Sequence, residues 1–259
     1  MKKKTINVVL LPYSAGSLGR NNGCEAAPGT VKEIIGKLAE EYFKGKIKLD
    51  FSYLNLQLLE PEEALKRIEK EATRKIGNAF TIFVGGDHSI SYATIKAFAK
   101  KYKRKTVVWL DSHADAMDCL TVPSHEDVTK TLVERKIIKR NELIFFGLQR
   151  VWPREKKFIE KRKIVSLQSR DLPKLEKLIK GKQVYLSIDF DVFNKRIAFA
   201  TGYADGKLKM NEFTKLWCSI ADRIRVLDFV EYNPLLDKNN TGQKLIERIF
   251  KIILKSLCN

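Results

Sequence analysis

Short apolar runs alternate with longer amphipathic stretches along almost the whole chain. The runs are rich in Val, Ile and Phe and do not alternate strictly with polar residues, as is typical of strands that are covered on both faces. They predict strands at residues 6–11, 47–53, 80–84, 107–110, 143–146, 164–167, 184–188 and 226–230. Helical periodicity between them predicts helices at residues 30–43, 62–75, 91–101, 126–134, 174–180, 211–222 and 242–257. Pro28 and Pro61 stand where two of these helices are expected to begin.

This repeated strand–helix alternation predicts an α/β fold with a mostly parallel sheet and helices on both of its faces. The chain has 259 residues, 44% of them hydrophobic, which suits a single domain with a sizeable core. We find no internal repeat, low-complexity stretch or linker, so residues 1–259 are expected to form one catalytic domain. The two longest polar irregular segments are residues 14–29 and 194–206.

Polar motifs follow three of the predicted strands. His88 lies in a Gly-Gly-Asp-His-Ser sequence, residues 111–115 read Asp-Ser-His-Ala-Asp, and Asp189 and Asp191 flank a phenylalanine. Alternate residues of an extended segment point the same way, and ligands of such folds bind outside the carboxyl ends of the strands. We therefore expect these carboxylates and imidazoles to converge.

Imidazole and carboxylate are the ligands that borderline and hard divalent cations take. Four carboxylates and two imidazoles exceed what one ion needs, whereas two ions roughly 3.5–4 Å apart could share bridging carboxylates and hold a water between them. A set without cysteine fits Mn²⁺ better than structural zinc. Each motif alone could be a turn or a helix cap, but together they predict a metal site. Its ligands would be His88, Asp111, His113, Asp115, Asp189 and Asp191.

The formal net charge of +18 raises the question of nucleic acid. There is no nucleic-acid-binding motif and no row of aromatic residues that would stack bases. We therefore interpret the lysines as a solvated surface and expect no specific nucleic-acid binding, with weak binding to polyanions at low salt.

The chain shows no sign of export or of membrane insertion. No apolar run is long enough to span a bilayer, and no signal-type stretch follows the basic start of the chain. The four cysteines are widely separated and form no Cys-x-x-Cys, which favours reduced thiols over a disulfide framework. We expect a cytoplasmic protein with no membrane partner.

Five motifs, in this order, resemble those of the ureohydrolase family: arginases, agmatinases, formiminoglutamases and relatives. The resemblance covers nearly the whole chain. The first motif, Gly-Cys-Glu-Ala-Ala-Pro, is similar to the family's Gly-x-Glu-x-Gly-Pro, and the last, Glu-Tyr-Asn-Pro, to its Glu-Val-Asn-Pro. The motifs lie at residues 23–28, 85–89, 111–115, 187–191 and 231–234.

The resemblance implies a three-layer α/β/α domain with an eight-stranded sheet, two Mn²⁺ ions per chain, and a homo-oligomer, a trimer or hexamer. One ion would be held by His88, Asp111, Asp115 and Asp189, and the other by His113, Asp111, Asp189 and Asp191. Asp111 and Asp189 would bridge the ions, and Asp115 would also orient the attacking hydroxide.

Two further residues become catalytic candidates. His125 matches the family's loop histidine and could protonate the departing amine, although it could instead be an exposed loop residue that caps the next helix. Glu231 follows the strand at residues 226–230 and could pair with a cationic amidine. Glu231 and Asp228 could equally be ordinary polar residues near a strand end.

Some positions depart from the family pattern. Asn194 stands where an aspartate is usual, and Glu126 rather than glycine follows His125. Trp152 occupies the place of the aspartate that lies near the α-ammonium group of arginine in arginases, which argues against L-arginine and makes Trp152 a candidate substrate contact. Arg150 or Arg154 could bind a substrate carboxylate, or both could be surface residues.

The sequence therefore predicts a binuclear manganese hydrolase that cleaves the C–N bond of a small linear guanidino compound to urea and an amine. A formimino hydrolase that releases formamide is the alternative within the same class. An inactive relative that only binds a ligand or partner is the alternative of another class. The complete ligand set disfavours it, while Asn194 and Glu126 keep it open.

Overall fold

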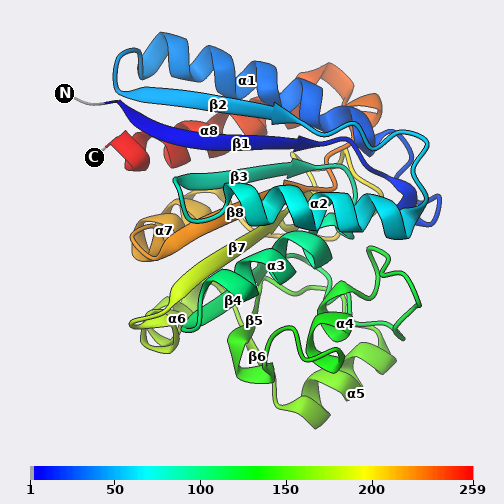
Figure 1. Ribbon diagram of the computed structural model, residues 1–259. Coiled ribbons are helices and arrows are strands. Elements are labelled where there is room, and N and C mark those ends of the chain that lie inside the picture. Colours follow the sequence, from blue (N-terminus) through cyan, green and yellow to red (C-terminus); the bar gives the residue numbers. More distant parts are fainter. Residues whose placement is uncertain (1–2, 259) are drawn as a thin grey trace.

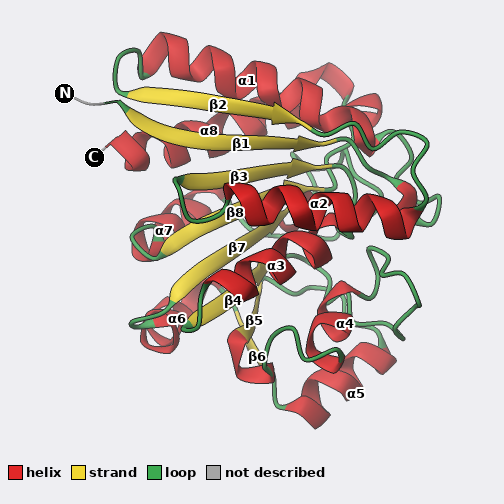
Figure 2. Ribbon diagram, in the orientation of Figure 1, coloured by secondary structure: helices red, strands yellow, loops and turns green. Residues whose placement is uncertain are grey.

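All eight predicted strands form, and they make one sheet in which every neighbouring pair is parallel (Figures 1 and 2). The computed structural model describes residues 3–258. The strands are β1 (Lys4–Leu11), β2 (Ile47–Tyr53), β3 (Phe80–Gly85), β4 (Lys105–Leu110), β5 (Leu143–Phe146), β6 (Val165–Leu167), β7 (Gln183–Asp189) and β8 (Ile224–Val230). Their order in the sheet is β2-β1-β3-β8-β7-β4-β5-β6. The predicted α/β fold class is confirmed.

Helices cover both faces of this sheet and give three layers. They are α1 (Ala27–Tyr42), α2 (Pro61–Lys75), α3 (Ile90–Lys101), α4 (Val128–Glu134), α5 (Pro153–Arg162), α6 (Leu172–Ile179), α7 (Met210–Ile220) and α8 (Thr241–Cys258). The buried side chains of α1, α6, α7 and α8 belong to one core cluster, and those of α2 to α5 belong to the other.

The central strands contribute to both clusters, which explains their unbroken apolar sequences. In β4, Val108 and Leu110 belong to the cluster beneath α1, α6, α7 and α8, whereas Val107 and Trp109 belong to the opposite one. A strand that is buried on both faces has no polar face, so its sequence does not alternate.

Helix α5 is the one helix that the periodicity did not predict. Among its ten residues only Glu155 and Phe158 are buried, so the apolar stripe is too narrow to produce a helical period. Local signals were nonetheless present. Pro153 occupies the first helical position. The side chain of Glu155, in the first turn, accepts a hydrogen bond from the amide of Trp152, the residue just before the helix.

The position of the site follows from the order of the central strands. After β3 the chain passes through α3 to β4, which is not the neighbour of β3 in the sheet. Strands β8 and β7, which come later in the sequence, lie between β3 and β4. The carboxyl ends of β3, β8, β7 and β4 are therefore neighbours, at the right-hand edge of the sheet in Figure 1. All the predicted metal motifs follow these strands.

The sequence predicts no membrane-spanning segment and reduced thiols rather than disulfides. Within residues 3–258, no helix combines the length and the apolar character needed to cross a membrane. All four cysteines are free: Cys24 is buried, Cys119 and Cys218 are exposed, and Cys258 is partly buried.

Candidate metal centre and active site

Three strand ends bring the six predicted ligands into two adjoining groups. The Nδ1 atom of His88 lies 3.2 Å from Oδ2 of Asp111, 3.1 Å from Oδ2 of Asp115 and 3.1 Å from Oδ2 of Asp189. The Nδ1 atom of His113 lies 2.8 Å from Oδ2 of Asp191 and 3.7 Å from Oδ1 of Asp111. The two oxygens of Asp111 thus face different imidazoles, and both candidate metal groups include this residue.

The donor set fits divalent cations. Nδ1 of His88 and Oδ2 of Asp111 are buried and lack a hydrogen-bond partner within the described chain. No lysine or arginine of residues 3–258 forms an ion pair with the four clustered aspartates. Buried charge without a partner is costly, and oxygen and nitrogen ligands without sulfur suit cations such as Mn²⁺.

Burial and mutual contact shift the pKa values of the clustered residues. Burial, together with the charges of Asp191 and Asp115, raises the pKa of Asp111 well above its usual range, and burial with Asp191 and Asp111 does the same for Asp189. Burial opposes the charge of His88, but the three carboxylates that lie close to Nδ1 outweigh burial and raise the pKa of His88. Cations and protons should therefore compete for these ligands.

A buried chain of hydrogen bonds orients His88. Its Nε2 lies 2.8 Å from Oγ of Ser187, which donates to Oδ1 of Asp228 over 2.6 Å. Asp228 also accepts from Ser91 (2.6 Å) and Tyr185 (2.5 Å). Because Ser187 donates to Asp228, it is free to accept from Nε2–H of His88, which leaves the Nδ1 lone pair directed at the cluster.

Asp228 is therefore not an ordinary polar residue near a strand end, which is an alternative that the sequence allows. It is fully buried inside β8, between Leu227 and Phe229. Asp228 is the one charged residue of the predicted apolar strand at residues 226–230, and this was the sequence signal that could have marked it.

Glu231 lies at the wall of the same cavity. Its Oε1 accepts from the His88 amide over 2.7 Å, and its Oε2 accepts from Nδ2 of Asn21 over 2.7 Å. Nδ1 of His125 lies 3.5 Å from Oε1 of Glu231. Burial works against the Glu231 charge, but the contact with His125 lowers the pKa of Glu231 below its usual value.

His125 is not an exposed loop residue, so that alternative is wrong. Its exposed fraction is 7%, and its amide donates to the carbonyl of Gly16 over 2.9 Å. Burial lowers the pKa of the imidazole, but the hydrogen bond and charge of Glu231 outweigh burial and raise this pKa to about 9. His125 is one of the residues that line the cavity. Its Nε2 is buried and has no hydrogen-bond partner among residues 3–258, with Oε1 of Glu126 4.0 Å away.

Two site residues adopt the left-handed backbone conformation that is unfavourable for residues with a side chain. Asp115 has φ 47° and Glu231 has φ 65°. Each costs on the order of 1 kcal/mol or more and persists only because neighbouring structure enforces it. The Glu231 amide is held by the carbonyl of Gly86 at 2.7 Å, and the Asp115 carbonyl by the amide of Thr129 at 3.0 Å.

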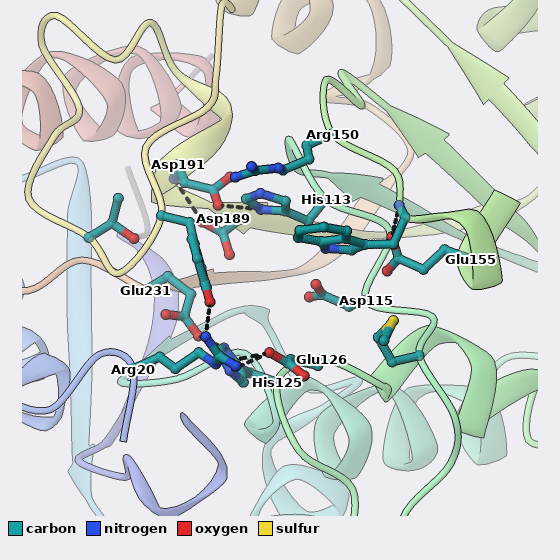
Figure 3. A pocket seen from close by; sticks show the side chains of 14 residues that line it. Arg20, His113, Asp115, His125, Glu126, Arg150, Glu155, Asp189, Asp191 and Glu231 are labelled. Carbon is teal, nitrogen blue, oxygen red and sulfur yellow. Dashed lines mark hydrogen bonds and ion pairs between the residues drawn. The ribbon is translucent and has the colours of Figure 1, made fainter. Parts of the chain in front are cut away.

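The cavity, of about 400 Å³, opens from the metal groups to solvent (Figure 3). Both long irregular segments contribute to it: Arg20 comes from the first, and Thr201 and Tyr203 come from the second. Trp152 also lines it and is 47% exposed, with the Arg150 guanidinium 4.9 Å from its ring. The sequence did not single out Arg20 or Tyr203, since neither belongs to a motif.

The remaining departures from the family pattern lie outside the two metal groups. Oδ1 of Asn194 accepts from the Arg196 amide over 3.0 Å and so shapes a local turn. Glu126 pairs with Arg20 at 3.2 Å, at the cavity lining. Arg154 is exposed and pairs with Asp118 at 2.9 Å, away from the residues that line the cavity.

Comparison with known proteins gives a consistent result. A sequence model of the Arginase family matches residues 4–254. An arginase of Bacillus subtilis (strain 168) is 26% identical to the chain over 98% of the chain and 99% of that protein. The crystal structure of arginase from Bacillus subtilis matches 96% of this chain and 98% of its own chain, with a TM-score of 0.83 at 21% identity. The crystal structure of formimidoylglutamase from the same species matches 99% of this chain and 88% of its own chain, with a TM-score of 0.85 at 18% identity.

Mn²⁺ should stabilise the protein, because it would offset the mutual repulsion of the buried aspartates. At about one hundred times the dissociation constant, one bound ion contributes about 2.7 kcal/mol, which corresponds to a rise in Tm of about 5 °C or more. Differential scanning calorimetry with EDTA and then with excess Mn²⁺ measures this. Asp111→Asn should abolish the rise and the exposed Asp118→Asn should keep it; an equal rise in both variants would contradict the site.

The ion pair of His125 should make stability depend on pH. The folded pKa of about 9 lies above the unfolded value of 6.5, so the stabilisation is complete below about pH 6.5 and is lost as the pH rises through 9. In EDTA-treated protein, the difference in unfolding free energy between the native chain and His125→Asn should shrink from pH 6 to pH 10. Urea denaturation across this range measures it, and a constant difference would exclude the raised pKa.

Proposed function

This chain belongs to the arginase family of ureohydrolases, metal-dependent hydrolases of C–N bonds, and from its site we propose that it uses two Mn²⁺ ions to hydrolyse a linear guanidino compound to urea and an amine. The observation that carries the proposal is the position of Asp111, whose two carboxylate oxygens face His88 and His113 separately. Such a carboxylate is suited to bridge two cations.

We assign the ligands in two overlapping sets. His88, Asp111, Asp115 and Asp189 would hold one ion, and His113, Asp111, Asp189 and Asp191 would hold the other. The contacts at Nδ1 of His88 support all of the first set, and those at Nδ1 of His113 support Asp111 and Asp191 in the second. Asp189 enters the second set by resemblance to the family alone. When bound, the two ions would supply Lewis acidity and make a water held between them easy to deprotonate.

Asp115 lies between the cluster and the open cavity, which favours it as the residue that orients the attacking water (Figure 3). Attack converts the planar amidine carbon to a tetrahedral one. The strained backbone at Asp115 would fix the carboxylate in advance, so that little reorganisation is needed during the reaction.

Glu231 would bind the cationic amidine. A carboxylate offers about four acceptor positions. The His88 amide and Asn21 occupy two of them and His125 lies beside a third, which leaves one for the substrate. The lowered pKa keeps Glu231 ionised, so it can form charge-assisted hydrogen bonds with a planar guanidinium and set its orientation over the metal groups.

His125 would protonate the departing amine. Its raised pKa keeps the imidazole protonated near neutral pH. His125 lines the cavity, and its buried Nε2 has no hydrogen-bond partner within the described chain. An amine leaves only when protonated, so an acid beside the tetrahedral carbon removes this barrier. The contact with Glu231 couples amidine binding to the proton donor.

The mouth of the cavity favours a substrate tail without a second positive charge. Glu126 pairs with Arg20, and Asp205 pairs with Arg150 at 3.0 Å. Glu155 accepts from the amides of Ala116 and Trp152. Each carboxylate there is engaged, whereas Trp152 offers a flat surface to an alkyl or planar tail. This argues against L-arginine, whose α-ammonium group would find no partner.

A formimino hydrolase releasing formamide is the second candidate. The similarity in fold to formimidoylglutamase supports it, and Arg20 and Arg150 could bind an acidic tail. The inactive alternative is weaker, because neither Asn194 nor Glu126 contacts the six proposed ligands. We further propose one catalytic domain over residues 1–259, a cytoplasmic location, which the free cysteines favour, and a homotrimer or homohexamer as in its family.

Product analysis should test the function. We expect urea from an uncharged- or acid-tailed guanidino compound with added Mn²⁺, and little from L-arginine or agmatine. Asp111→Ala and Asp189→Ala should each lower the rate by at least about a thousandfold, since each would remove a shared ligand, while the exposed control Asp118→Ala should be unaffected. Formamide without urea would favour the second candidate. No product with two Mn²⁺ bound would favour a binding protein.

Glu231→Gln should raise KM for cationic amidines. Loss of a charge-assisted pair costs about 1.5–3 kcal/mol, which is about tenfold or more in kcat/KM. Steady-state kinetics at pH 7.5 measures this, with Mn²⁺ content and Tm determined on the same sample to show that the site is intact. Glu134→Gln, at an exposed position, is the matched control. An unaltered KM in Glu231→Gln would exclude this residue from substrate binding.

A further inference from the structure

The amino ends of the strands carry an excess of positive charge. In Figure 1 the turns that enter β1, β2, β3 and β7 lie at the left of the sheet, opposite the metal centre. We call the following cations the basic end: Lys3, Lys4, Lys44, Lys46, Lys101, Lys103, Arg104, Lys105, Lys139, Arg140, Arg162, Lys163, Lys180, Lys182, Arg223 and Arg225. In the same turns the acidic residues of the described chain are Glu142 and Asp222, and Glu134 ends helix α4 just before the turn that leads to β5.

Few of these cations are neutralised by an ion pair. Lys105 pairs with Glu142 at 3.5 Å, Arg223 with Asp222 at 3.2 Å, and Arg162 with Glu134 at 2.7 Å. Within residues 3–258, no other member of the basic end forms a salt bridge. Its positive charge therefore faces solvent.

The surface is more positive than the net charge of +18 suggests, because much of the negative charge is inside. Lys75 is the single buried lysine or arginine of the described residues. The buried acidic residues are Asp87, Asp111, Asp127, Glu155, Asp189, Asp191, Asp228 and Glu231. Most of them belong to the metal centre or its supports at the other end of the sheet.

The sheet arranges these cations in a row. Parallel strands are about 4.8 Å apart, so the entry turns of eight strands extend over about 33 Å. Neighbouring turns touch: the Arg104 guanidinium lies against Gly181, where an added Cβ would be 2.8 Å from it. The turn at residues 76–79 has no exposed cation of its own, but the Lys101 ammonium lies over Gly77.

The row also includes a hollow of about 480 Å³ between the starts of β1, β3 and β8. Lys4 and Arg225 line it together with Asn78 and Tyr102, and Asp222 is its one acidic residue. Long cationic side chains around a concave surface can follow a polyanion that is not flat.

From these observations we infer that the basic end binds the phosphate backbone of duplex nucleic acid without reading its sequence. A duplex carries one negative charge per about 1.7 Å of its axis, so a row of about 33 Å matches roughly one helical turn. No side chain set for base recognition lies there, as is typical of backbone binding.

An anionic membrane fits this end less well. Membrane-binding surfaces usually combine basic residues with apolar side chains that insert between lipids. Most exposed large apolar residues of the described chain lie at the carboxyl ends of the strands or in the segments that follow them: Leu18, Tyr53, Leu58, Leu120, Trp152, Leu235 and Leu236. Tyr42 is nearest to the basic end, and the Lys251 ammonium covers its ring at 3.5 Å.

The test uses the full chain and a fluorescein-labelled 20-base-pair DNA duplex. Fluorescence anisotropy between 50 and 200 mM NaCl should show binding that weakens steeply with salt. The variant Lys103→Glu, Arg104→Glu, Lys180→Glu should weaken binding by at least about tenfold at 50 mM NaCl and reduce the salt slope by about three. The neutral variant Lys103→Gln, Arg104→Gln, Lys180→Gln should weaken it in the same direction.

The matched control changes the net charge equally at the opposite end: Lys195→Glu, Lys207→Glu, Lys209→Glu. It should stay within about twofold of the native chain, because it lies beyond the Debye length of about 7–14 Å at these salt concentrations. Equal losses in both triple variants would overturn the inference, since net charge alone would then explain binding. So would tighter binding at 150 mM NaCl to phosphatidylcholine vesicles with 30% phosphatidylserine than to the duplex. Circular dichroism melting establishes that each variant is folded.

Discussion

The structure depends on the burial of like charges at one end of the sheet. Asp111, Asp189 and Asp191 are buried at neighbouring strand ends, with two imidazoles as their only cationic neighbours among the described residues. Such a cluster is unfavourable for folding unless protons or metal ions compensate it. The surrounding elements therefore have to hold the carboxylates in place against their own repulsion, and much of the polar interior serves this purpose.

Two buried aspartates outside the cluster show how this is done. Asp228 supports His88 through Ser187 from within β8. Asp87 accepts from the amides of Gly16 and Ser89 at 2.8 Å each and so ties the segment after β1 to the segment after β3. Burial, with the charge of Glu231, raises the pKa of Asp87 to about 7. The backbones also approach closely, since a Cβ on Gly86 would lie 2.0 Å from the Tyr13 carbonyl.

The same constraint explains the contrast between the two ends of the sheet. Most of the buried acidic residues lie in or beside the site, whereas the basic end at the other side of the sheet has few ion pairs. A parallel sheet places all carboxyl ends on one side and all entry turns on the other. The sequence interpretation of the lysines as an evenly solvated surface did not include this segregation, because turns that are far apart in the sequence become neighbours only in the folded sheet.

The sequence by itself determined the eight strands, the α/β class and the motifs that carry His88, His113 and the aspartates. These features are local: periodicity and spacing report which residues are covered and which share a face. Only the tertiary structure decided that Glu231 meets Asn21 and His125, that Ser187 and Asp228 orient His88, and that Arg20 and Tyr203 reach the cavity. Those contacts join residues separated by up to 210 positions, and no local pattern specifies which distant segments a sheet will bring together.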